Sequence, residues 1–352
     1  MENIGAYIKN ELAMQASELA KKIVDLQYER QPEFWNKFGK RGKEMSLRDA
    51  AYHLPFLGES IETGDKTIFT NYILWVKKLF RGLKFPDEAI IETLRCTLEV
   101  INKEFPKEQS DLTAKYIEAG IEKLKIPLED SKPYINPHDP LGELAMKFNQ
   151  ALLNADRQMA SKLVLDAVEK GTSVQDIYMN VFQKSQYEVG RLWLDNKITV
   201  AKEHFCSAAT QQIMSHLYPY IFATDRVGHK MVAASVGGEL HEIGIRMVAD
   251  FFEMNGWDTY YLGANSPTDS ILYSIEENKA DLVGLSIAIP YQIGLLKSTI
   301  ERIREKYSGS VKILIGGYAL QGIGQNWQEF NADGYAEDAQ KAVDYADKLM
   351  AS

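Results

Sequence analysis

A regular alternation of short apolar runs and helical stretches, beginning at Lys230, constrains the fold of this chain more than any other feature. Helical stretches of about ten to seventeen residues separate the apolar runs, so each pair of predicted strands requires a right-handed crossover in a parallel sheet. Residues 228–352 are therefore predicted to form a Rossmann-like, doubly wound α/β domain. The predicted strands are Met231–Val236, Thr259–Leu262, Leu282–Ile287 and Ile313–Ile315, with Gly334–Ala336 as a short candidate for a fifth.

A proline-rich linker at residues 126–140 divides the rest of the chain. Its four prolines exclude a helix. Residues 1–125 show no period-two alternation, and Pro86 followed by two acidic residues is typical of a helix start. This first part is therefore predicted to be an all-helical domain.

Residues 141–222, between the linker and the α/β domain, again show helical periodicity. Ser173 and Thr199 stand where helix caps are expected. Four helices joined by short loops favour a four-helix bundle. The expected order is a helical domain, the linker, the bundle and the α/β domain.

The composition narrows the classes of function. A net charge of -9 and a pI near 5.4 argue against a nucleic-acid partner, which needs clustered Lys and Arg. The short basic run Lys37–Lys43 is interpreted as a solvated loop. Cys96 and Cys206 lie far apart in helical patterns and indicate neither a disulfide framework nor a zinc site. The sequence shows neither a membrane span of about 18 apolar residues nor a signal-peptide core, so we expect a cytoplasmic protein with no membrane partner.

A histidine stands in the turn after the first predicted strand, in the sequence Gly238-Glu239-Leu240-His241-Glu242-Ile243-Gly244. The carboxyl ends of parallel strands are where an open α/β sheet presents side chains to a ligand. The spacing E-x-H-x-x-G is followed by S-x-A at Ser286–Ala288 and by the pair Gly316-Gly317. Together these elements resemble the cobalamin-binding fold.

The resemblance implies a cobalt corrinoid bound at the carboxyl ends of the strands. His241 would be the lower axial ligand of cobalt in place of the cofactor's own benzimidazole base, and Glu239 would accept the second ring N–H of the imidazole. The displaced nucleotide tail would insert between the sheet and its helices. Taken singly, the small residues near it also have structural explanations, as turn glycines or a core hydroxyl. These small residues are Gly238, Gly244, Ser286, Gly316 and Gly317.

The predicted bundle carries a second string, in which Trp193 is followed after nine residues by Glu203-His204. W-x9-E-H is similar to the cap of the adenosylcobalamin-dependent photoreceptors, a family of light-sensitive gene repressors. By that resemblance Trp193 packs over the adenosyl group, Glu203 and His204 surround the same upper pocket, and Val200 lines it. An indole offers adenine a large flat surface, and a carboxylate accepts the ribose hydroxyls. The alternative interpretation is that Trp193 is an ordinary core residue of the bundle and that Glu203 and His204 lie on a solvated helix face.

Two further positions bear on this resemblance. Glu239, where many cobalamin-binding enzymes have Asp, is similar to the light-sensing branch. Leu194 departs from that branch, because the repressors have a histidine there that binds cobalt after light has expelled the adenosyl group. Leucine cannot ligate, so a photoproduct with two histidine ligands is not expected through this position.

The N-terminal region is rich in aromatic residues around His53, its one histidine. A helical fold of this kind looks like the non-haem globin-type sensor domains. Photocobilins, which are cobalamin photoreceptors that also carry a bilin, pair such a domain with the cobalamin module. By that resemblance His53 would contact the pyrrole nitrogens of biliverdin. The alternative is an ordinary aromatic core in which His53 caps a helix or loop.

The sequence thus favours a light sensor that binds adenosylcobalamin, with biliverdin as a candidate second chromophore and no catalytic residues of its own. It would signal as a homo-oligomer or through a protein partner. The alternative, from the enzyme class, is a corrinoid carrier subunit of a methyltransferase or mutase. Trp193 and Glu203 favour an adenosyl ligand over a methyl ligand, since a methyl donor needs open access above cobalt.

Overall fold

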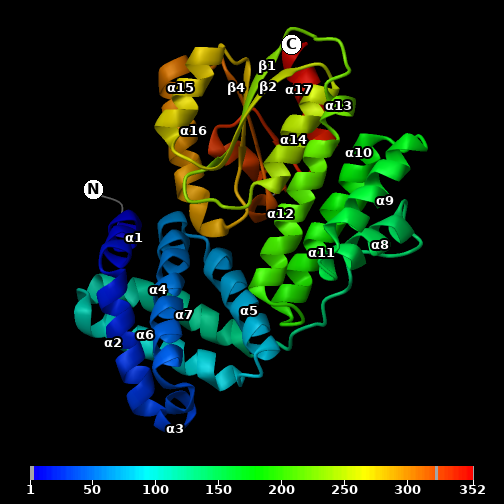
Figure 1. Cartoon of the computed structure of the whole chain (residues 1–352). Helices are drawn as coiled ribbons and strands as arrows, with labels where there is room; N and C mark the ends of the chain where they lie inside the picture. The colour runs from blue at the N-terminus through cyan, green and yellow to red at the C-terminus, as the bar shows by residue number, and fades with distance from the viewer. Residues whose placement is uncertain (1–3, 322–323, 352) are drawn as a thin grey trace. The chain divides into compact units, whose positions relative to one another are not determined.

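The computed structural model describes residues 4–321 and 324–351, and it divides into two compact units (Figure 1). Unit 1 comprises Met1–Asp130 with Leu194–Asn196, and unit 2 comprises Ser131–Trp193 with Lys197–Ser352. The predicted fold class is confirmed: an all-helical N-terminal region, a helical bundle and a parallel Rossmann-like sheet. Among the described residues, no helix is long and apolar enough to cross a membrane.

Unit 1 is built from helices alone. Helix α6 begins directly after Pro86, as predicted, and the Asp65 side chain caps α5 by accepting from the Thr67 N–H at 2.8 Å. The prediction of a loop at Lys37–Lys43 is wrong: Lys and Arg are good helix formers, and this solvated segment forms η1 and the start of α4. The elements are α1 Ile4–Met14, α2 Ala16–Arg30, α3 Pro32–Trp35, η1 Asn36–Phe38, α4 Gly39–Thr63, α5 Lys66–Gly82, α6 Asp87–Glu104 and α7 Lys107–Leu124.

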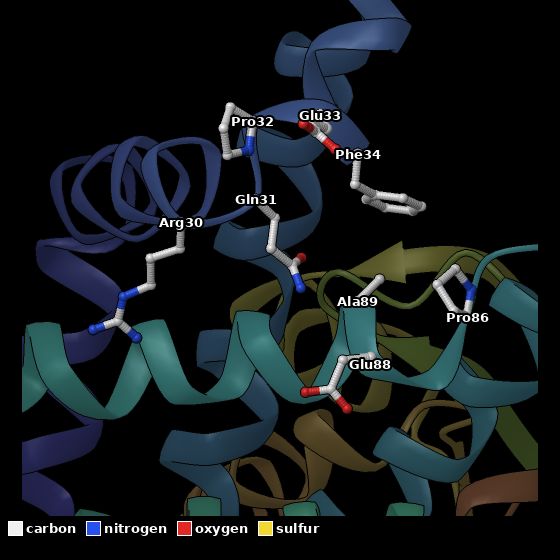
Figure 2. A pocket seen from close by; sticks show the side chains of 8 residues that line it. All are labelled: Arg30, Gln31, Pro32, Glu33, Phe34, Pro86, Glu88 and Ala89. Carbon is white, nitrogen blue, oxygen red and sulfur yellow. The ribbon is translucent and has the colours of Figure 1, made fainter.

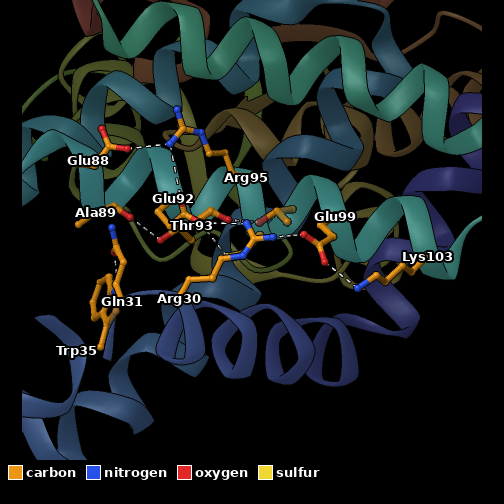
Figure 3. A network of polar contacts seen from close by, with 12 residues as sticks. Arg30, Gln31, Trp35, Glu88, Ala89, Glu92, Thr93, Arg95, Glu99 and Lys103 are labelled. Carbon is orange, nitrogen blue, oxygen red and sulfur yellow. Dashed lines mark hydrogen bonds and ion pairs between the residues drawn. The ribbon is translucent and has the colours of Figure 1, made fainter. Parts of the chain in front are cut away.

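A network of ion pairs joins α2 to α6 (Figure 3). Arg30 pairs with Glu92 at 3.0 Å and also with Glu99, which in turn accepts from Lys103 at 2.7 Å. Arg30, Glu99 and Lys103 are between 33% and 66% exposed, so water weakens these pairs and they contribute little to stability. The network fixes the register of two helices whose packing depends on the apolar core of unit 1.

The bundle of unit 2 begins after the proline-rich linker, which contains no helix, as predicted. Ser173 and Thr199 both accept backbone N–H bonds as helix caps, as expected. A π-helical turn, η2, continues α10 into α11. The elements are α8 Gly142–Leu153, α9 Arg157–Glu169, α10 Val174–Ile177, η2 Tyr178–Phe182, α11 Gln183–Leu194, α12 Val200–His216 and α13 Tyr218–Ile221.

The sheet of unit 2 has five parallel strands in the order β2-β1-β3-β4-β5. All four predicted strands and the short fifth candidate are present, with ends shifted by a few residues at most. Alternate residues of β1 face opposite sides, as a period of two requires: Met231 and Ala233 join one core, Val232 and Ala234 the other. The elements are β1 Lys230–Val236, α14 Ile243–Met254, β2 Asp258–Ser266, α15 Thr268–Asn278, β3 Leu282–Ser286, η3 Pro290–Gln292, α16 Ile293–Tyr307, β4 Lys312–Gly316, η4 Tyr318–Leu320, η5 Gly324–Phe330, β5 Gly334–Ala336 and α17 Ala339–Met350.

Helices cover both faces of the sheet (Figure 1). On one face α15 and α16 enclose a core that includes Ile271 and Ile300. On the other, α14 and α17 pack against the bundle, and Phe251 of α14 shares one continuous core with Phe148 and Tyr178 of the bundle. The bundle and the sheet are thus held together by apolar burial, the dominant favourable contribution to folding.

One buried carboxyl lies in this shared core. Asp250 of α14 is 5% exposed and accepts a 2.8 Å hydrogen bond from Tyr178 Oη of the bundle. Burial raises the pKa of Asp250 to about 6, against the lowering effects of the Tyr178 bond and the Arg246 charge. The folded protein therefore holds a proton at Asp250 in a pH range where the unfolded chain has lost it.

Because this pKa is higher in the folded state, the free energy of unfolding should fall as pH rises from about 4 to about 6. At pH 7.5 Asp250→Asn, which still accepts from Tyr178, should raise the free energy of unfolding by about 1–3 kcal/mol. At pH 4.5, where the folded carboxyl keeps its proton, this gain should fall to about a third of that size. Denaturation curves at both pH values measure the effect, with the exposed Asp344→Asn as the control. A variant less stable than wild type at pH 7.5 would contradict the assignment.

Candidate corrinoid site

The candidate site lies where the strand order reverses. The chain passes from β1 to β2 on one side and then to β3 on the other, so the carboxyl ends of β1 and β3 open a crevice between their loops. The loop after β1 carries Gly238, Glu239 and His241, and the loop after β3 begins at Ser286. The fold therefore brings together these two predicted groups of residues.

Glu239 is the centre of this arrangement. Its side chain is fully buried and accepts four hydrogen bonds. Oε1 accepts from the His241 backbone N–H at 2.9 Å and from His241 Nδ1 at 2.6 Å. Oε2 accepts from the backbone N–H groups of Ala288 at 2.6 Å and Ile289 at 3.1 Å. The carboxylate thus ties the β1 loop to the β3 loop.

The same contacts set the state of His241. Nδ1 carries the hydrogen donated to Glu239, which leaves the Nε2 lone pair available on a side chain that is 65% exposed. Burial opposes ionisation of Glu239, but the bonds from His241 and Ala288 outweigh it and lower the pKa of Glu239. The Glu239 hydrogen bond outweighs burial at His241 and, with the charges of Glu239 and Glu203, raises the pKa of His241. A neutral imidazole with one oriented nitrogen is what an axial ligand of cobalt requires.

The β1 loop is further held by Asn265 at the end of β2, which the sequence did not reveal. Asn265 Oδ1 accepts from the Gly238 N–H at 2.7 Å, and the Asn265 N–H donates to the Glu239 carbonyl at 2.8 Å. Gly238 has a φ of +77°, which favours glycine at this position. The loop that carries His241 is therefore anchored on both neighbouring strands before any ligand binds.

Glu242 connects this loop to the bundle and was also missed. Its Oε1 accepts from Gln211 Nε2 of α12 at 3.1 Å, and its Oε2 accepts from Tyr261 Oη at 2.9 Å. Arg246, one turn further along α14, donates to the Gln211 carbonyl at 3.1 Å and to Ser215 Oγ at 2.7 Å. Pairs that lie 31 or more residues apart in the chain give no periodic signal, so only the fold could identify them.

The small residues divide into two kinds. A Cβ at Gly244 would meet nothing within 4 Å, so this position leaves open space beside the His241 loop. A Cβ at Gly317, where φ is +105°, would come within 2.2 Å of the Ile287 carbonyl and 2.8 Å of Ser286 Oγ. A Cβ at Gly316 would come within 2.9 Å of the Ala336 carbonyl. The glycine pair is thus required by the packing of adjacent strand ends, and Gly244 is the position that spares room for a ligand.

The upper-face residues lie on α11 and α12 of the bundle. Trp193 is half-buried near the end of α11, and Val200, which is 51% exposed, begins α12. Glu203 Oε2 lies 2.5 Å from His204 Nδ1, and the Ser207 hydroxyl lies 2.9 Å from Glu203 Oε1. The Glu203 charge is the smallest of the causes that raise the pKa of His241, after the hydrogen bond and charge of Glu239.

The candidate bilin contact, His53, lies in the core of unit 1 at 7% exposure. Its Nδ1 is 2.8 Å from Tyr72 Oη, and Phe56 stacks on Tyr72 with ring centroids 3.6 Å apart. Burial lowers the pKa of His53 to about 4, so the imidazole is neutral near pH 7. An aromatic core around a neutral histidine is compatible with both interpretations of this region.

A surface pocket of about 430 Å³ in unit 1 lies elsewhere, between the α2–α3 turn and the start of α6 (Figure 2). Its lining includes Arg30, Phe34 and Glu88 but none of the predicted site residues. Both cysteines are buried and free. Burial raises the pKa of Cys96 to about 12 and that of Cys206 to about 11, so neither is a reactive thiolate near pH 7.

Comparison with known families agrees with the geometry of unit 2. Residues 229–344 match the family model of the B12 binding domain, and residues 144–218 match a second B12 binding domain model. Residues 3–124 match the family model of the phycobilisome proteins. The three matches leave the linker region between the helical domain and the bundle unassigned.

The relatives resemble the second part of the chain. A corrinoid protein of Desulfitobacterium hafniense is 26% identical over 210 residues, which are 58% of this chain and 96% of that protein. Dimethylamine corrinoid protein 3 of Methanosarcina mazei is 28% identical over 168 residues, which are 47% of this chain and 96% of that protein. The solved structure of the Methanosarcina barkeri monomethylamine corrinoid protein aligns with a TM-score of 0.53 at 22% identity, over 59% of this chain and 99% of that chain. At this identity the structural likeness shows the fold.

The raised pKa of His241 gives a testable pH dependence. A proton on Nε2 competes with cobalt, so corrinoid affinity should fall as pH decreases through the pKa of His241, which lies above the ordinary 6.5. Glu239→Gln removes the charge that raises this pKa, so the fall should move to lower pH. At pH 8.5 the variant should also bind about 10–100-fold more weakly, because the imidazole loses its orienting partner.

Absorbance titrations with adenosylcobinamide between pH 5.5 and 8.5 measure both effects, since this corrinoid has no base of its own to titrate. Glu276→Gln, on the exposed surface of α15, is the control and should behave as wild type. An unchanged midpoint in the Glu239 variant would show that Glu239 does not set the pKa of the ligand.

Proposed function

We propose that the chain is a light sensor that holds adenosylcobalamin in unit 2. The matches of residues 144–218 and 229–344 to B12 binding domain models support the corrinoid part of this proposal. The observation that carries the proposal is the presence of Trp193 and the bonded pair Glu203–His204 on α11 and α12 of the bundle. A carrier that must admit a methyl donor has no use for an indole and a carboxylate at the upper face.

The residues present fit a corrinoid with a displaced base. The imidazole of His241 offers its Nε2, its tautomer is fixed by Glu239, and Gly244 leaves open space at the start of α14. Apolar side chains at the crevice, Leu240 at 73% exposure and Leu295 at 37%, are available to be covered by an apolar ring system. His241 would hold the cobalt from below.

The upper face fits an adenosyl group. Trp193 would supply the flat apolar surface for adenine, and Glu203, held by Ser207, would accept the ribose hydroxyls. Val200, exposed at the start of α12, would close the side of the pocket. Leu194 cannot ligate cobalt. Of the proposed upper-face residues, His204 is the one that carries an imidazole.

Adenosylcobalamin supplies a cobalt–carbon bond that visible light breaks. Trp193 and Glu203 would then lose the group on which they were packed. Gln186 of α11 joins these helices, because its amide donates to Thr210 Oγ1 at 2.8 Å and lies 3.0 Å from the Ser207 hydroxyl. Loss of the ligand would favour a different packing of α11 and α12, a two-state change read out by self-association or a protein partner.

We also propose that unit 1 carries a bilin, with biliverdin as the candidate. The match of residues 3–124 to phycobilisome proteins supports a pigment-binding role, and His53 with Tyr72 is the polar centre of the aromatic core there. The high pKa of the buried Cys96 thiol opposes a thioether bond to the pigment, so the bilin would be held without a covalent bond.

A second candidate function is a corrinoid carrier of a methyltransferase, and the relatives favour it. The named relatives are corrinoid proteins, two of them of dimethylamine and monomethylamine systems. They align with about half to three fifths of this chain, so two fifths or more of the chain lies outside the likeness to each of them. The carrier function by itself explains neither the presence of unit 1 nor that of Trp193 and Glu203.

The first experiment loads the protein in the dark with adenosylcobalamin and illuminates it with green light. We expect a histidine-on dark spectrum that changes irreversibly, with a change of mass in light scattering. Glu203→Gln and Trp193→Ala should each weaken adenosylcobalamin about 10-fold and leave hydroxocobalamin unchanged. Equal effects on both corrinoids would remove the adenosyl assignment. Transfer of methyl from bound methylcobalamin to a thiol acceptor, with no light response, would establish the carrier.

The second experiment adds biliverdin to the protein. We expect a red absorption band that disappears into the solvent on acid denaturation, because no covalent bond forms. His53→Gln should shift or abolish the band, whereas Cys96→Ser should keep it. A band that remains on the denatured chain, or one indifferent to His53, would contradict this site.

A further inference from the structure

Gln292 is a buried side chain whose polar atoms are unpaired. It is the last residue of η3, immediately precedes α16 and lies six positions after Ser286, the last residue of β3. The residue is 2% exposed. Neither its Nε2 nor its Oε1 has a hydrogen-bond partner among residues 4–321 and 324–351, the part of the chain that the structure describes.

The amide lies beside the loop that carries His241. Gln292 Nε2 is 3.7 Å from the point where a Cβ on Gly238 would stand. Leu295, in the first turn of α16, is likewise 3.4 Å from the Cβ position of Gly237. Two adjacent glycines of the β1 loop thus face Gln292 and Leu295, with no side chain of their own between them.

Leaving such an amide unpaired is costly. A buried donor or acceptor without a partner costs about 1–3 kcal/mol, and about 90% or more of buried polar groups in folded proteins are paired. If the side chain at position 292 only had to fill space, an apolar side chain of the same length would do so without this cost. The position therefore calls for a ligand that brings both an acceptor and a donor.

We propose that Gln292 hydrogen-bonds to the nucleotide tail of the corrinoid, beside Gly237 and Gly238. The inference rests on the proposed base-displaced binding, and it adds a residue that discriminates between tails. Two parts of a tail can both donate and accept: the ribose hydroxyl and the edge of a purine base, to which glutamine pairs well. The outer edge of dimethylbenzimidazole carries only methyl groups and can do neither.

The test compares wild type with Gln292→Met, which keeps the length of the side chain and removes its polar atoms. Dissociation constants are measured by absorbance for cobalamin, for an adenine-based cobamide and for cobinamide, which has no tail. We expect the variant to bind the adenine cobamide about 5–10-fold more weakly and cobinamide as tightly as wild type. An equal loss with cobalamin assigns the contact to the ribose, and a loss confined to the adenine cobamide assigns it to the base.

Two controls separate a loss of the tail contact from a general effect on folding. Gln27→Met alters another glutamine of 2% exposure, in α2 of unit 1, and should change none of the three constants. The ligand-free Gln292→Met protein should unfold at the same temperature as wild type or higher, because an unpaired amide has been removed. If this variant does not fold, Gln292→Leu is used in its place.

The proposal is overturned if the variant binds all three corrinoids as wild type does, or if it loses cobinamide as strongly as the tailed corrinoids. A lower unfolding temperature of the ligand-free variant would also overturn it, since the amide would then have a structural partner. Failure of the light response leaves these binding constants unaffected. Failure of base displacement is visible separately, as a wild-type spectrum without histidine ligation.

Discussion

The site depends on one buried carboxylate, that of Glu239. A charge withdrawn from water is destabilising unless it is fully hydrogen-bonded, and here three backbone N–H groups and one imidazole N–H meet that requirement. The backbone donors come from two loops, so a single side chain holds the carboxyl ends of β1 and β3 in register. The orientation of His241 is therefore a consequence of how the sheet is closed at this end, and the ligand nitrogen is positioned before a cofactor arrives.

Helix α12 gives the lower face a direct connection to the bundle. Near its start lies Glu203, which we assign to the proposed upper face, and two turns later Gln211 donates to Glu242, next to His241, the proposed axial ligand. In the proposed sensor this continuous helix would connect the upper face to the loop of His241.

The fold could be predicted largely from the sequence because its signals are local. Strand ends, the caps at Ser173 and Thr199, and the convergence of Glu239 on His241 each involve residues close in the chain. The segment Lys37–Lys43 was misjudged because solvation alone does not distinguish a loop from an exposed helix. Asn265, Gln211 and Gln292 were missed for another reason: their importance lies in partners, or in the lack of them, that only the folded chain defines.

The lower face cannot decide between a sensor and a carrier, because both would need a neutral imidazole fixed by a carboxylate. What differs is the demand on the upper face. A carrier must let a second protein reach the cobalt, whereas a sensor must hold a bulky group until light removes it. In the proposed sensor Trp193 and Glu203 would increase the hold on such a group and restrict access to anything else, and neither would contribute to the binding of the corrinoid ring from below. This demand on the upper face is the reason for proposing the sensor first, whereas the relatives favour the carrier.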